Sequence, residues 1–244
     1  MALFTKDTLQ QNIFFFVYGN FSDKNIEIMR DLAQNRWYFV DFEDTNEKMR
    51  WPLNQPPMSD ELYKLDPHAV IESKQARNAV SVVGQSVGAE NAFQNYLDIM
   101  QFVDCLASCE GAIAVVDPLT GQIIRAQTWE EMVYAPLLTP SPDLTMQTAT
   151  IAVHDDNGLI WIRTQGLIKF GQPELSMHNV EEEHVPIIYK LFEKLIKKIV
   201  LENKLLPENI TITVNPKLKY KTLYAGHYED DDFWGNVHIE LVRE

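Results

Sequence analysis

Long apolar runs are missing from this sequence. None approaches the roughly 20 residues that a membrane-spanning helix requires. The apolar run nearest the N-terminus, residues 13–18, is too short for the core of a signal peptide, and no basic segment precedes it. These absences predict a cytoplasmic protein with no membrane association.

Basic residues are the scarcer of the two charged classes. The 244 residues include 21 Lys and Arg against 35 Asp and Glu, which gives a formal net charge of -14 at pH 7. This balance argues against nonspecific binding of nucleic acid and of anionic lipid, because both are negatively charged. It is compatible with a basic protein partner, and equally with solubility alone.

Cysteine is also scarce, with Cys105 and Cys109 as the two copies. They lie four residues apart within a helical pattern. This spacing is poor for a disulfide and supplies half of a four-ligand zinc site. We therefore expect two small buried side chains in a reducing compartment.

Histidine occurs six times, but never in the spacing of a helical zinc motif. His154 precedes two aspartates, and His227 precedes the acidic run 229–232, so either place could hold a divalent cation. Hairpin tips and solvated acidic loops have the same composition. We therefore expect no metal ion and no cofactor.

The spacing of apolar residues predicts an α+β fold with a β-α-β opening. Residues 13–18 predict a strand, residues 24–36 a helix, and residues 37–42 a second strand. Later strands come as hairpins, the clearest being 148–153 and 159–163 around an Asn-Gly turn. This mixture favours a mixed or largely antiparallel sheet covered by helices.

The same reasoning places the remaining elements and the core. Further strands are expected at residues 68–72, 79–83, 112–116, 210–214 and 237–242. Further helices are expected at residues 90–108, 129–134 and 185–202. The side chains expected to be largely buried are Phe93, Leu97, Met100, Ile188, Phe192 and Leu195. Prolines at 136–142 predict a boundary between an N-terminal α/β subdomain, 1–135, and a C-terminal α+β subdomain, 143–244, unless the two form a single domain, 1–244.

The segment 161–175 combines the end of a strand with two glycines and a proline: W-I-R-T-Q-G-L-I-K-F-G-Q-P-E-L. It resembles a signature of bacterial proteins that are classed as a domain of unknown function, approximately Trp-Leu-His-Thr-His-Gly-Leu followed by Gly-x-x-Glu-Leu-Glu. The matching residues are Trp161, Thr164, Gly166, Leu167, Gly171, Glu174 and Leu175. The resemblance extends weakly over residues 112–180.

The two histidines of that signature are replaced here by Arg163 and Gln165. Side chains one residue apart share a face of a strand, so the histidines would form a metal pair or an acid–base pair. Arg and Gln bind carboxylates, phosphates or amides and are poor metal ligands. The resemblance implies a member that keeps recognition without the chemistry. We expect Trp161, Arg163, Gln165 and Glu174 to line one surface, with Glu174 orienting Arg163; the alternative is a pair that only holds the loop.

Residues 84–88, G-Q-S-V-G, fit the G-x-S-x-G pattern of a nucleophile elbow. Ser86, Asp117 and His154 follow one another in the chain order of α/β-hydrolases, and the last two end expected strands. The predicted hairpins disturb the parallel sheet that this fold requires. A serine hydrolase is therefore the alternative, and whether the chain is an enzyme stays open, with a noncatalytic role favoured.

Residues 227–234, H-Y-E-D-D-D-F-W, interleave aromatic and acidic side chains. Such a segment is suited to a basic protein partner, which we expect to contact Asp230, Asp231, Phe233 and Trp234. The leading hypothesis is a noncatalytic, acidic cytosolic binding protein, for example an inhibitor or immunity-type protein. Its alternatives are a hydrolase that uses Ser86 and a sensor that binds an anionic small ligand.

Overall fold

The computed structural model describes residues 4–44, 50–87, 90–154, 158–225 and 236–244. The chain divides into two compact units. The N-terminal unit contains Asn12–Gln85 and Gln94–Met146, and the C-terminal unit contains Met1–Gln11, Ser86–Phe93 and Gln147–Glu244. Each unit is built on one sheet with its own helices, so the α+β fold is confirmed.

A five-stranded sheet forms the centre of the N-terminal unit, in the order β2-β3-β1-β4-β5. Its strands are β1 (Gln10–Gly19), β2 (Phe39–Asp44), β3 (Asn78–Val87), β4 (Ala112–Asp117) and β5 (Gln122–Arg125). The pairs β1/β4, β2/β3 and β4/β5 are antiparallel. The helix α1 (Asp23–Ala33) connects β1 to β2, which confirms the expected β-α-β opening.

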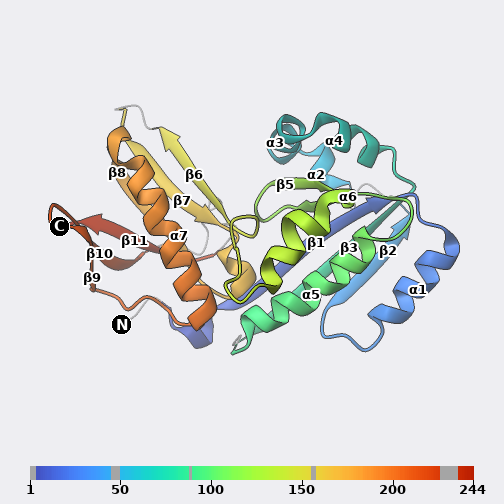
Figure 1. The fold of residues 1–244 in the computed structure, drawn as a ribbon, viewed down its shortest axis with the longest axis horizontal. Helices are drawn as coiled ribbons and strands as arrows, with labels where there is room; N and C mark the ends of the chain where they lie inside the picture. Colours follow the sequence, from blue (N-terminus) through green and yellow to red (C-terminus); the bar gives the residue numbers. More distant parts are fainter. Residues whose placement is uncertain (1–3, 45–49, 88–89, 155–157, 226–235) are drawn as a thin grey trace. The chain divides into compact units, whose positions relative to one another are not determined.

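Helices cover both faces of this sheet, because β1 buries aromatic side chains on both (Figure 1). Phe15 contacts Tyr96 and Trp129, whereas its neighbour Phe16 contacts Trp51. The first face carries α5 (Ala92–Ala107), α6 (Ala126–Trp129) and the π-helical turn η2 (Glu130–Tyr134). The second carries α2 (Trp51–Asn54), α3 (Met58–Leu65) and α4 (Pro67–Lys74). A 3-10 helix, η3 (Ala135–Leu138), follows η2.

The helix α4 replaces the strand expected at residues 68–72, so that prediction is wrong. Asp66 caps the helix by accepting a hydrogen bond of 2.8 Å from the Ala69 N–H, and Pro67 occupies the first position. An Asp cap followed by proline is a helix start, and it outweighs the β propensity of Val70 and Ile71.

A six-stranded sheet forms the C-terminal unit, in the order β6-β7-β8-β11-β10-β9. Its strands are β6 (Ala149–His154), β7 (Ile160–Gln165), β8 (Glu174–Val180), β9 (Thr211–Asn215), β10 (Leu218–Ala225) and β11 (His238–Arg243). The antiparallel pair β6/β7 confirms the expected hairpin strands, although Asn157 of the expected turn lies outside the described residues, and β8/β11 is the parallel pair. Figure 1 shows α7 (Val185–Glu202) lying along one face of this sheet. Short 3-10 helices are η1 (Lys6–Thr8), η4 (Leu167–Phe170) and η5 (Glu182–His184).

The observed division differs from the expected boundary in three segments. Met1–Gln11 and Ser86–Phe93 belong to the C-terminal unit, and residues 143–146 belong to the N-terminal unit. Lys6 Nζ donates to the Gly171 carbonyl at 2.7 Å, and Gln11 Nε2 donates to the Lys169 carbonyl at 2.8 Å. The Phe93 ring also stacks on Phe170, with ring centroids 6.3 Å apart. These contacts join the first residues and the start of α5 to the C-terminal unit.

The cysteines are not the buried pair that the sequence predicts. Cys105 is exposed and Cys109 is partly buried, and both are free thiols. The reason is the rotation of α5, which buries Tyr96 and Ile99 beside the expected Met100 and leaves the expected Phe93 and Leu97 half-buried.

Candidate functional site

The segment 161–175 forms a strand, a turn of 3-10 helix and a second strand. The helix η4 lies between Gly166 and Gly171, whose φ angles are 99° and 56°. These left-handed conformations are strained for a residue with a Cβ. The two glycines that match the signature therefore shape the turn from β7 into β8.

Glu174 is sealed inside this turn, with 2% of its surface exposed. Its carboxylate accepts hydrogen bonds from the Thr164 hydroxyl at 2.7 Å, the Ile168 N–H at 3.2 Å and the Asn236 amide at 3.4 Å. Burial raises the pKa of Glu174, and these hydrogen bonds oppose the shift. Glu174 is thus a buried acceptor that closes the loop.

Arg163 lies beside Trp161, as their alternation on β7 predicts. The Arg163 guanidinium is 5.1 Å from the centre of the Trp161 ring, and the Trp161 indole donates to Ser176 Oγ at 2.8 Å. His178 stacks on Trp161 with centroids 4.9 Å apart. Arg163 is buried, with 8% of its surface exposed. The cluster lies on one side of β7 and β8.

Two parts of the sequence-based site therefore require correction. Among the described residues, none of the hydrogen bonds to the Glu174 carboxylate comes from Arg163. Glu174 therefore neither orients Arg163 nor lines a surface, because Thr164 and the backbone of η4 occupy its oxygens. Gln165, the fourth expected residue, is half-buried at the end of β7. The other expected contact residues, Asp230, Asp231, Phe233 and Trp234, lie outside the described residues.

The expected catalytic residues are not arranged as an elbow requires. Strand β3 continues through Ser86 to Val87, so Ser86 lies in extended backbone and not on a sharp strand-to-helix turn. A Cβ at Gly84 would collide with the Ile99 side chain, so this glycine serves the packing of β3 against α5. Asp117 is buried and accepts a hydrogen bond from the Leu119 N–H in the β4–β5 turn, whereas His154 is exposed at the end of β6.

We predict that a serine-directed fluorophosphonate will not label Ser86. An activated serine needs the exposed turn that the extended strand lacks. The measurement is mass spectrometry of the treated protein, with Ser86→Ala as the control. A stoichiometric adduct on the wild type that Ser86→Ala abolishes would restore the hydrolase alternative.

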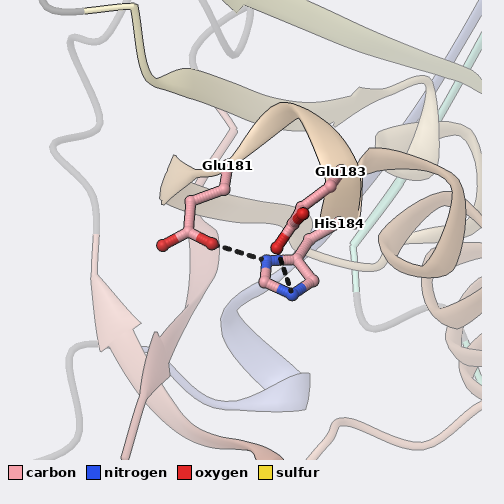
Figure 2. A group of neighbouring side chains, drawn as sticks. All are labelled: Glu181, Glu183 and His184. Atoms are coloured by element: carbon pink, nitrogen blue, oxygen red, sulfur yellow. Dashed lines mark ion pairs between the residues drawn. The ribbon is translucent and has the colours of Figure 1, made fainter.

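A cluster that the sequence analysis did not identify lies at the start of α7. His184 Nδ1 is 3.2 Å from Glu181 Oε2, and His184 Nε2 is 3.8 Å from Glu183 Oε1, as Figure 2 shows. These residue types can bind a metal ion. The second Glu181 oxygen, however, lies 3.8 Å from the Arg243 guanidinium, which repels cations. The ion pairs within the cluster and the positive end of α7 account for its geometry.

A groove beside β2, which we call the β2 groove, is open enough to receive a partner. It has a volume of about 410 Å³ and is open to solvent. Its lining residues are Arg30, Ala33, Gln34, Tyr38, Phe39, Val40, Asp41 and Phe42. Five of these lining residues, 38–42, are consecutive, so the edge of β2 itself forms one wall of the groove. The end of α1 forms the other.

An exposed aromatic side chain lies in the groove wall, because Phe39 is 79% exposed. On α1, Met29 is buried, whereas Ile28 and Leu32 are each nearly half exposed. Strand β2 ends the sheet order, and in the described part of the chain no strand pairs with its outer edge. An unpaired edge beside exposed aromatic residues is typical of a contact surface.

Comparisons of the chain with protein-family models, with curated proteins and with solved structures find no match. The resemblance of segment 161–175 to the domain-of-unknown-function signature therefore stays a prediction. Among the described residues, no helix is both long and apolar enough to cross a membrane.

Proposed function

We propose that this chain is a noncatalytic binding protein that recognises a basic protein partner, in the manner of an inhibitor or immunity-type protein. The observation that carries the proposal is the β2 groove, an open channel along a strand edge with which no described strand pairs, in a chain of net charge -14. An inhibitor needs such a surface and needs no reaction of its own.

The chemistry of the β2 groove supports a basic occupant. Asp41 is exposed in the groove wall, whereas the basic lining residue, Arg30, lies with its guanidinium 5.6 Å from the centre of the Phe42 ring. Phe39 supplies an aromatic side chain whose burial on binding would stabilise a complex. Carboxylates beside an aromatic anchor match a partner that has lysine or arginine next to apolar residues.

Charge also separates this proposal from the sensor of an anionic ligand. The net charge of the chain repels anions at long range. Arg163, on which the sensor depends, is covered and lies against Trp161. The β2 groove is open, and its exposed Asp41 is the acidic group available to a basic partner.

A peptide-display selection on the immobilised protein tests the proposal. The library should contain random segments, and the counter-selection should use the double variant Phe39→Ser with Asp41→Lys. Segments enriched on the wild type are expected to be basic and to bind the double variant at least about tenfold more weakly, which corresponds to about 1.4 kcal/mol. Both replaced side chains are exposed, so the free energy of unfolding should change by no more than about 0.5 kcal/mol for each.

A matched control comes from another exposed surface of the same unit. Leu138 is 57% exposed and Glu131 is exposed. The double variant Leu138→Ser with Glu131→Lys therefore makes the same changes of charge and apolar area away from the β2 groove. Equal loss of binding in both double variants, or enrichment of neutral and acidic segments, would contradict the proposed function.

A further inference from the structure

The outer edge of β2 carries backbone groups that a partner can bind. A strand at the edge of a sheet presents alternate N–H and C=O groups that no neighbour satisfies. Here β3 pairs with β2 from Phe39↔Val83 to Asp44↔Asn78, which uses the inner edge. The outer edge faces the β2 groove, because residues 38 to 42 line it without interruption.

We infer that the occupant of the β2 groove is an extended segment of the partner, which pairs with β2 as an additional strand and presents alternating basic and apolar side chains. This inference rests on the proposed function, because it specifies how the basic partner binds. Backbone pairing would supply affinity, and the side chains of β2 would supply selectivity.

The two faces of β2 define the side chains that the segment needs. Phe39 and Asp41 share one face, since they are two residues apart, and both are exposed. A lysine or arginine opposite Asp41 forms an opposite-charge pair across the strands, and its aliphatic part covers Phe39. Val40 and Phe42 share the other face and are half-buried, so β-branched residues suit the positions opposite them.

A second copy of this chain is a poor occupant of the same edge. Antiparallel pairing of F-V-D-F-E-D with itself would place one acidic strand beside another. Like charges directly opposite each other destabilise a strand pair. Acidic edge residues thus disfavour self-association, and they leave the edge open to a basic chain.

The test uses a synthetic ten-residue peptide that alternates lysine and valine, with fluorescence anisotropy as the measurement. Two modified peptides carry methyl groups on backbone nitrogens. In one peptide every lysine is N-methylated, and in the other every valine is N-methylated. In a paired strand the N–H groups of alternate residues point to opposite edges. The lysines are expected on the face of Asp41, so in the bound peptide either the lysine N–H groups or the valine N–H groups point toward β2. The peptide that is N-methylated at those residues should bind at least about tenfold more weakly. The other set should stay within about twofold of the unmodified peptide.

Amide hydrogen exchange supplies a second measurement on the protein itself. Bound peptide should slow exchange at the outward-facing amides among residues 39–42. The variant Asp41→Lys should weaken peptide binding at least about tenfold, whereas Glu131→Lys, which makes the same charge change, should stay within about twofold. Peptide of opposite charge, with glutamate in place of lysine, should not bind.

The outcomes separate the inference from the proposed function. Equal effects of the two N-methylated sets, or no binding of the unmodified peptide at millimolar concentration, would overturn strand addition. The proposed function would then stand or fall on the display selection alone, since segments that depend on Phe39 and Asp41 can bind in another conformation. Failure of groove-dependent selection, in contrast, would remove the proposed function.

Discussion

Replacing Phe192 with alanine is expected to lower the free energy of unfolding by about 3–5 kcal/mol. Phe192 is fully buried in the middle of α7, where Ile188, Leu195 and Ile196 are also buried. Removing the ring takes away its transfer free energy and leaves a cavity that neighbouring side chains fill only in part. Urea denaturation followed by circular dichroism measures the change.

Leu201 provides the matched control on the same helix. It is 39% exposed, so Leu201→Ala should change the free energy of unfolding by less than about 1 kcal/mol. A loss of that small size for Phe192→Ala as well would show that α7 does not form the core of the C-terminal unit.

Replacing Glu174 with leucine is expected to lower the free energy of unfolding by more than about 2 kcal/mol. Leucine has a similar size but no acceptor, so the Ile168 N–H and one Asn236 contact lose their partner inside the protein. Each orphaned buried donor costs about 1–3 kcal/mol. The exposed carboxylate Glu182 is the control, because Glu182→Leu should stay within about 0.5 kcal/mol.

The pH dependence of stability provides a second test of Glu174. Burial raises its folded-state pKa above the ordinary value of 4.5. Its contribution is therefore fully present below that value and is lost as the pH rises through the folded-state pKa. The free energy of unfolding of the wild type, minus that of Glu174→Gln, should decrease as the pH rises above 4.5. A difference that stays constant or increases would contradict the assignment of Glu174 as a desolvated carboxyl.

The spacing of apolar residues and the local turn signals were sufficient to predict helices and strands that are defined by residues close together in the sequence. The helix α7 follows from apolar residues at helical spacing after Pro186, and the pairing of β6 with β7 follows from the Asn-Gly dipeptide in the sequence between them. Strands β5, β8 and β10 escaped prediction. Strand β5 has four residues, and polar residues such as Ser176 in β8 and Thr222 in β10 are buried, which obscures the apolar alternation of a strand.

The candidate site was harder to predict for a related reason. Glu174 and Arg163 are close in sequence, which favours an ion pair between them. The Glu174 carboxylate instead accepts a hydrogen bond from Asn236, which precedes β11 and is brought near by the pairing of β11 with β8. The β2 groove exists because no described strand covers the outer edge of β2. The spacing of apolar residues does not indicate which strand lies at the edge of a sheet. The Phe–acid alternation of residues 39–44 was the available signal.

The interleaving of the two units has a consequence for the order of synthesis. All five strands of the N-terminal sheet leave the ribosome before residue 147, so this unit can fold while the rest is still being translated. The segments Met1–Gln11 and Ser86–Phe93 emerge early but belong to the later unit. Expression of Gln147–Glu244 as a separate fragment would therefore lack Lys6 and Gln11, which bond the turn around η4, and supplying Met1–Gln11 in trans should restore part of that lost order.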